Sequence, residues 1–284
     1  MRIVDYLCNS FTPPRADDWD RVIAAQGVPL KIRRDPEDGF ADPEIVVSRM
    51  DELGIGTLVM VTGEPHHSRF KFDLHEITAP PEETEGLVRR FPGRFVGLWV
   101  IDADRGMDGV RRAAAALDEP WVVGLYNHVH SFDRRFDDAD FYPYYSLCAQ
   151  RGVPMVMQAG TSGGLAPSEC GHPIAVDRPA IYFPETTFVL SHTGWPWVRE
   201  AIAMALKHPN VYLGTAAYPP LHWDAELVAF IRRAGRRKVL FGTNFPTVGH
   251  RHALGQLGRL ELGEEVEGLF LEGNARRVFP RLPG

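Results

Sequence analysis

The segment from Trp121 to Gly160 reads WVVGLYNHVHSFDRRFDDADFYPYYSLCAQRGVPMVMQAG and holds one strand–helix–strand unit. Its two apolar runs, Trp121–Tyr126 and Val153–Gln158, are short and continuous, which is typical of strands buried on both faces of a parallel sheet. Phe141–Gln150, between them, is predicted to be a helix. This alternation indicates a parallel sheet covered by helices.

The same alternation continues along the chain in both directions. Six further apolar runs predict strands at Arg2–Leu7, Gly56–Val61, Arg94–Ile101, Thr187–Ser191, Val211–Leu213 and Lys238–Gly242. The stretches among them predict helices at Pro43–Leu53, Pro81–Arg90, Met107–Leu117, Trp197–Lys207 and Asp224–Arg233. Eight strand–helix pairs are typical of a (β/α)8 TIM barrel. An open doubly wound sheet is the rival, but the GxGxxG turn that would favour it is absent.

We therefore predict an α/β protein, a single TIM-barrel domain over residues 1–284. We expect an insertion at about 11–40, where the chain is long and charged after the first strand. We also expect a loop over the barrel mouth at about 160–173, where Gly and Pro are frequent.

Composition narrows the class of partner. The chain has 31 basic and 37 acidic residues in 284, a net charge of −6, which argues against nucleic acid because phosphate binding needs a basic face. No apolar run approaches the roughly 20 residues of a membrane span. The three cysteines are widely spaced, which indicates reduced thiols and a cytoplasmic location. A small-molecule substrate is the expected partner.

The residues that follow the predicted strands are candidates for chemistry, because a TIM barrel places its site at the carboxyl ends of its strands. This set is rich in amides and imidazoles and poor in carboxylates: Asn9, His66, Tyr126, His128, His130, Gln158, His192, Asn244 and, in a loop, the aromatic Trp195. His250, near the last helix, is expected at the surface. Arg69, Arg134, Arg135 and Arg178 are the arginines that could supply charge for an anionic substrate.

At this point the chain resembles the amidohydrolase superfamily, in its amidohydrolase 2 branch of decarboxylase-like and lactonase-like barrels. The resemblance covers nearly the whole chain. It rests on the order and spacing of RIVDYLCN, the segment 121–160, FPETTFVLSHTGWPW, NVYLGTAAY, KVLFGTNFP and GNARRVF. It implies a TIM barrel and an enzyme, and it suggests a homodimer.

The resemblance also implies a metal site built from His-x-His after strand one, a His after strand five, a His after strand six and an Asp after strand eight. The corresponding residues in this chain are Leu7, Asn9, Gln158, His192 and Asn244, of which His192 alone matches. Amide oxygens bind Zn²⁺ weakly, and a leucine cannot bind it. We therefore expect no cofactor and no metal at the family positions.

A relocated Zn²⁺ site is the remaining way for this chain to hold a metal. His128 and His130 form a second His-x-His, and two such residues on a strand would share one face. Together with His192, and with Cys8 or a carboxylate, they would complete a ligand set.

Three functions remain open. The first is a metal-independent hydrolase acting on a lactone, a cyclic ester or a similar carbonyl compound, as lactonases in this branch imply. His192, His128 and Asn244 would be catalytic, and Gln158, Asn9, Tyr126, His66, Trp195 and His130 would bind substrate. Its pH–rate profile would have a limb near the ordinary histidine pKa. The alternatives are a nonoxidative decarboxylase with a relocated metal and a non-catalytic small-molecule-binding pseudoenzyme.

Overall fold

The computed structural model describes residues 2–27, 35, 37–68, 70 and 72–284. Eight strands pair in parallel in sequence order, which confirms the predicted TIM barrel. The strands are β1 (Ile3–Cys8), β2 (Ile55–Thr62), β3 (Phe95–Val100), β4 (Val122–Asn127), β5 (Met155–Gln158), β6 (Phe188–Ser191), β7 (Val211–Gly214) and β8 (Val239–Leu240).

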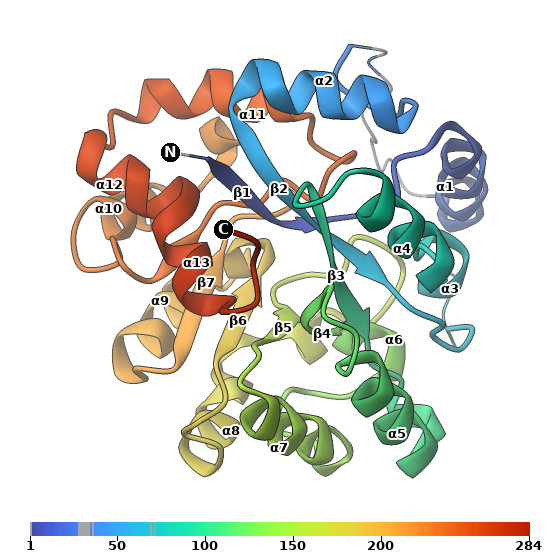
Figure 1. Cartoon of the computed structure of the whole chain (residues 1–284). Coiled ribbons are helices and arrows are strands. Elements are labelled where there is room, and N and C mark those ends of the chain that lie inside the picture. The colour runs from blue at the N-terminus through green and yellow to red at the C-terminus, as the bar shows by residue number, and fades with distance from the viewer. Residues whose placement is uncertain (1, 28–34, 36, 69, 71) are drawn as a thin grey trace.

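Helices surround these strands (Figure 1). They are α1 (Pro13–Gln26), α2 (Pro43–Leu53), α3 (Leu74–Ile77), α4 (Pro81–Arg90), α5 (Met107–Ala116), α6 (Val129–Phe132), α7 (Tyr142–Arg151), α8 (Asp177–Tyr182), α9 (Val198–Lys207), α10 (Ala225–Arg232), α11 (His250–Leu257), α12 (Glu264–Gly268) and α13 (Asn274–Val278). The bounds of α2 and α4 are those predicted, because Pro43 and Pro81 mark their first turns. The predicted insertion contains α1, and residues 28–34 and 36 of it lie outside the described residues.

The barrel interior is filled by side chains rather than open. Valines at 4, 59, 96, 123, 156 and 189 belong to one buried cluster with Tyr6, whose ring is fully buried. A Cβ at Gly214 would lie 2.0 Å from the hydroxyl of Tyr6, and one at Gly242 would lie 2.4 Å from its ring. These two glycines therefore make the space that the tyrosine occupies.

The seam between β1 and the β8 segment closes the barrel through contacts outside the short β8 strand. Backbone bonds join Tyr6 to Phe241 and Leu7 to Asn244 across it. The buried Asp5 carboxylate accepts hydrogen bonds from the backbone N–H and the hydroxyl of Thr243, and from His250 Nε2 at 3.0 Å. The side chain of Asp5, on the first strand, thus holds the segment that follows the last strand, β8.

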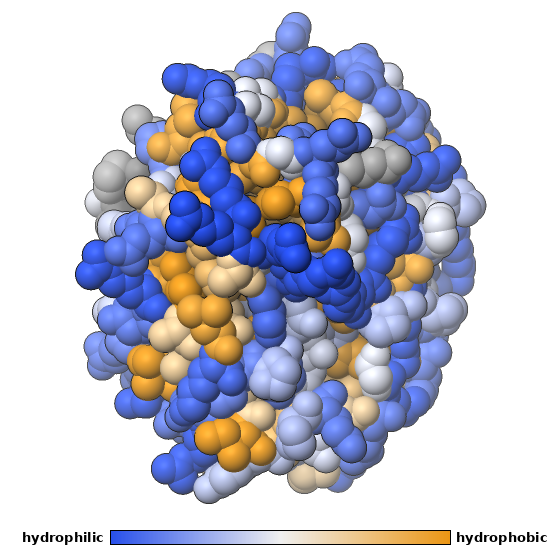
Figure 2. Space-filling view, turned by 90° about the vertical axis from the view of Figure 1, so that its left-hand side faces the viewer, coloured by the Kyte–Doolittle hydropathy of each residue, from blue (hydrophilic) through white to orange (hydrophobic). Residues whose placement is uncertain are grey.

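The surface of the barrel is mixed. On the side shown in Figure 2, hydrophilic residues cover most of the face and apolar residues gather in several separate patches. Within the described ranges, no helix combines the length and apolar character that a membrane span requires.

We predict that Asp5→Ala lowers the free energy of unfolding by about 3 kcal/mol or more, because it leaves several buried donors without an acceptor. Chemical denaturation measures this. Asp118→Ala is the control, since Asp118 is exposed and pairs only at the surface with Arg151, and it should change stability by less than about 0.5 kcal/mol. Equal losses in the two variants would show that Asp5 does not hold the seam.

Candidate active site

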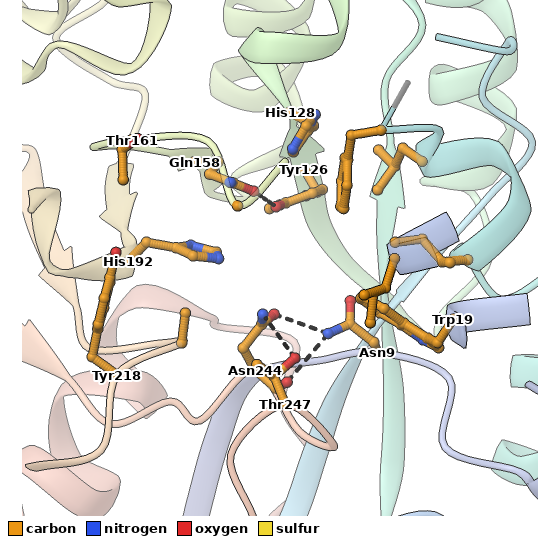
Figure 3. A pocket seen from close by; sticks show the side chains of 16 residues that line it. Asn9, Trp19, Tyr126, His128, Gln158, Thr161, His192, Tyr218, Asn244 and Thr247 are labelled. Atoms are coloured by element: carbon orange, nitrogen blue, oxygen red, sulfur yellow. Dashed lines mark hydrogen bonds between the residues drawn. The ribbon is translucent and has the colours of Figure 1, made fainter. Parts of the chain in front are cut away.

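A cavity of about 210 Å³ lies at the carboxyl ends of the strands, where the barrel fold predicts a site. Its polar side is formed by residues that follow β1, β4, β5, β6 and β8, and its apolar side is formed largely by α1 and α3 (Figure 3). The lining residues are Asn9, Trp19, Ile23, Phe72, Leu74, Ile77, Tyr126, His128, Gln158, Thr161, Gly163, His192, Ala217, Tyr218, Asn244 and Thr247.

His192 follows β6 and projects into the cavity from the side opposite Trp19 (Figure 3). Its backbone has φ +62°, a left-handed conformation that is uncommon for residues other than glycine and recurs at functional sites. The hydroxyl oxygen of Ser191 lies 2.7 Å from Nδ1 of His192 and 3.1 Å from the carbonyl oxygen of Met157, and its single proton can be donated to only one of them. We infer that the hydroxyl proton goes to the Met157 carbonyl, so that Nδ1 of His192 donates to Ser191 and Nε2 keeps its lone pair.

Burial controls the charge of this imidazole. It lowers the pKa of His192 to about 3, and the charge of nearby His130 contributes in the same direction. This pKa lies well below the ordinary histidine value at which the sequence predicts a limb of the pH–rate profile. At neutral pH the ring is an uncharged acceptor.

Gln158 and Tyr126 form a buried pair on the neighbouring strands β5 and β4. The hydroxyl of Tyr126 donates to Oε1 of Gln158 at 2.8 Å, and burial raises the pKa of this tyrosine, so it stays protonated. Because the bond uses the amide oxygen, it leaves the NH₂ group of Gln158 to donate to a molecule in the cavity.

Asn9 and Asn244 form a second pair, across the seam of the barrel. Nδ2 of Asn9 donates to Oδ1 of Asn244 at 2.9 Å and to its backbone carbonyl at 3.3 Å. Asn244 has φ +60°, a conformation that asparagine tolerates better than most residues. Figure 3 shows these two amides together on the wall of the cavity next to Thr247.

His128 lines the cavity, but His130 does not, and the expectation that they share one face of a strand is wrong. The strand β4 ends at Asn127, so both residues lie in the turn that begins α6. His128 Nδ1 lies 2.6 Å from the hydroxyl of Ser131, and its buried Nε2 has no hydrogen-bond partner. His130 Nε2 donates to the carbonyl of Gly160 at 3.0 Å.

Two other residues predicted to bind substrate lie outside the lining of the cavity. His66 Nδ1 is 3.3 Å from Asp102, and Trp195 is a 48% exposed residue whose ring packs on Tyr218. A role for either in binding remains a prediction.

Sequence reasoning missed the apolar wall of the cavity. Trp19 and Ile23 are four residues apart and share one face of α1, a spacing that could have been recognised in the sequence. Phe72, Leu74 and Ile77 belong to the segment around α3 and carried no comparable signal.

The amidohydrolase family profile, labelled Amidohydro_2, matches residues 10–281, nearly the whole chain. The chain belongs to this family. Members of the family are enzymes, and among those similar to this chain are decarboxylases and hydratases.

Three similar proteins illustrate the range. A 2-keto-4-carboxy-3-hexenedioate hydratase from Sphingobium sp. is 26% identical over 181 residues, which are 51% of this chain and 51% of the hydratase, so the match spans about half of each protein. An uncharacterised TIM-barrel protein from Bordetella bronchiseptica has a TM-score of 0.78 with 20% identity, over 99% of both chains.

The third is a 5-carboxyvanillate decarboxylase from Novosphingobium aromaticivorans, solved with manganese and a nitrobenzoic acid. It has a TM-score of 0.66 with 13% identity, over 98% of this chain and 96% of the decarboxylase. The two structures, at these identities, establish a shared fold.

A metal at the positions implied by the family does not fit the side chains present here. Leu7 is apolar, the amide oxygen of Asn244 already accepts from Asn9, and the amide oxygen of Gln158 already accepts from Tyr126. His192 remains as a single nitrogen donor. We therefore derive no chemical step through a metal at these positions.

A different group of side chains could in principle hold an ion. Among the described residues, the ligand atoms of Asp5, Cys8 and His250 lie within 4.8 Å of one another, and all three residues are buried. His250 was expected at the surface, but it is buried because it donates to Asp5 and its ring stacks on Phe245. Since the Asp5 carboxylate already accepts bonds from Leu7, Thr243 and His250, we interpret this group as the closure of the seam.

We predict that Asn244→Asp does not create a transition-metal site, because Leu7, Asn9 and Gln158 still supply no strong donor. Titration of wild type and variant with Mn²⁺ and Zn²⁺, followed by calorimetry, measures this. Binding of one ion per chain with micromolar affinity in the variant alone would show that the donor positions are misassigned.

We predict that the protein loses stability as the pH falls from about 6.5 to about 4. Burial lowers the pKa of His130 to about 4, whereas an unfolded histidine takes up its proton near pH 6.5. Between these values the unfolded state binds more protons, so the free energy of unfolding falls by up to about 1.4 kcal/mol per pH unit for each such histidine.

Denaturation at a series of pH values measures this slope. His130→Gln, which keeps a donor for Gly160, should make the loss shallower, and His222→Gln, at an exposed position, should leave it unchanged. Identical slopes in all three proteins would contradict the assignment.

Proposed function

We propose that this chain is a lyase that adds water to, or removes it from, a C=C bond conjugated with a carbonyl group in a small substrate. The observation that carries the proposal is that one cavity contains both a neutral acceptor nitrogen, on His192, and an amide donor, on Gln158. The similarity to a hydratase over half of the chain supports this reaction type.

The two groups suit the two charges that develop during hydration. A water molecule gives its proton to Nε2 of His192 while its oxygen bonds to the carbon remote from the carbonyl. The electrons of the C=C bond move to the carbonyl oxygen, which becomes an enolate and accepts a hydrogen bond from Gln158. The imidazolium then returns the proton to the carbon beside the carbonyl, which completes the addition.

The low pKa of His192 is compatible with this role. It keeps the Nε2 lone pair unprotonated over the physiological range. When negative charge develops on the substrate oxygen, it favours the imidazolium and raises the proton affinity of the ring at the moment of transfer. Ser191 acts through His192 and is a positioning residue, because it holds the tautomer.

Hydrolysis of a lactone or cyclic ester is the second candidate, because the same base and donor would activate water and stabilise the oxyanion of an ester. The observation that favours it is the absence of a charged side chain among the described residues of the lining, which suits an uncharged ester. Product analysis separates the two reactions, since hydration consumes the conjugated chromophore and hydrolysis releases an acid.

We predict that His192→Gln lowers kcat by about 10²-fold or more and that Ser191→Ala lowers kcat with little change in KM, because the tautomer is no longer held. The assay is a panel of unsaturated amides, esters and ketones, followed by loss of absorbance, and of lactones, followed by acid release. Between pH 5 and 8, kcat/KM for the wild type should be flat.

His172→Gln is the control, since this histidine packs on Trp197 and lies outside the described lining. Wild-type kcat in His192→Gln would overturn the assignment of the base. A complete lack of turnover on the panel by the wild type would favour a small-molecule-binding pseudoenzyme.

A further inference from the structure

We infer that the cavity selects an uncharged ligand (an amide, ester, lactone or ketone) over the corresponding carboxylate. This inference rests on the proposed function, because it names the substrate class of the same site. It sets the chain apart from the similar proteins whose names denote the conversion of carboxylic acids.

The described part of the lining carries no fixed charge. Among its described residues there is no Asp, Glu, Lys or Arg. A carboxylate moved from water into such a cavity loses its hydration without gaining a cation, which is costly for a buried ion.

Three of the four arginines that could have supplied a cation are engaged elsewhere. Arg134 pairs with Asp104 and Asp140, and Arg135 pairs with Asp137. Arg178 lies over the ring of Tyr182 on α8. Arg69, with Lys71, lies outside the described residues.

The imidazoles of the cavity do not replace the missing cation at neutral pH. Burial holds the pKa of His128 well below its usual range, with the charges of His130 and His192 acting in the same direction. Burial likewise lowers the pKa of His192 to about 3. Both rings therefore stay uncharged, and the acceptor Nε2 of His192 suits the O–H of water or a hydroxyl, or an amide N–H, better than an anion.

The remaining groups match a neutral ligand with an apolar body. Trp19 lies across the cavity from His192 (Figure 3), and Phe72 and Ile77 add apolar surface to the lining. Gln158 supplies an amide donor for one carbonyl oxygen. An apolar wall with a few polar groups on one side is typical of small-molecule sites. The cavity thus recognises shape and one carbonyl rather than charge.

Calorimetry with matched pairs tests the inference. The pairs are cinnamamide and cinnamate, crotonamide and crotonate, and benzamide and benzoate, each at pH 7.5. Of the three amides, the one that binds most tightly should have a Kd at least about tenfold lower than that of its carboxylate partner, because only the carboxylate loses the hydration of an ion. The apparent Kd of that carboxylate should fall about tenfold for each pH unit below 7.5, down to about pH 5.5, as its neutral fraction rises.

A designed cation gives an independent readout. Ile23 is half-buried on α1 and lines the cavity, whereas Ala25 is exposed on the same helix. Ile23→Arg should lower the Kd of the carboxylate by about tenfold or more, and Ala25→Arg, which adds the same charge outside the cavity, should leave it unchanged.

The outcomes separate this inference from the proposed function. A carboxylate that binds wild type as tightly as its amide, or no binding of any of the three amides, would overturn the inference. Amide binding without turnover would leave the inference in place and overturn the proposed reaction. If a carboxylate bound tightly and were hydrated, the proposed reaction would stand and the inference would be overturned.

Discussion

The buried carboxylate of Asp5 is the interaction on which the rest of the structure depends. It joins the first strand to the segment after β8 by accepting bonds from Thr243 and His250, where regular strand pairing is shortest. The next residue after Thr243 is Asn244, whose backbone N–H donates to Leu7. Closing the seam therefore also sets Asn9 and Asn244 against each other at the mouth of the barrel.

A second constraint is the lack of charged side chains among the described residues that line this mouth. The polar side chains here are uncharged and form hydrogen bonds with one another. The three pairs are Asn9 with Asn244, Tyr126 with Gln158, and Ser191 with His192. Two of the pairs occupy the amide oxygens of Asn244 and Gln158, whereas His192 contacts Ser191 through Nδ1 and leaves Nε2 unused. At the positions where the family resemblance implies a metal, this barrel thus carries neutral side chains that bond one another.

The fold was predictable because its signal is repeated. Eight apolar runs alternate with helices, and a misplaced boundary at one run does not change the topology. The end of β4 shows where this reasoning fails: periodicity extended the strand pattern to His128 and His130, but the chain turns into α6 after Asn127. Side-chain period arguments hold only while the strand continues.

The site was predictable only where strand ends fix the side chains. Asn9, Tyr126, Gln158, His192 and Asn244 line the cavity because each ends or follows a strand. Trp19 and Phe72 reach it from segments whose approach is set by tertiary packing, as shown by the contact of α1 with α3. The position of His250 likewise depends on a partner 245 residues earlier in the chain, which local sequence does not reveal.

The central claim is that the mouth of the barrel presents a neutral imidazole whose free lone pair lies on Nε2 of His192. Long-range ¹H–¹⁵N correlation spectra of the histidine rings, assigned with His192→Gln, measure the charge and the tautomer directly. The account predicts a neutral His192 ring with the proton on Nδ1 from pH 8 down to about pH 5, consistent with its pKa of about 3. An imidazolium at pH 7, or a neutral ring with the proton on Nε2, would contradict it.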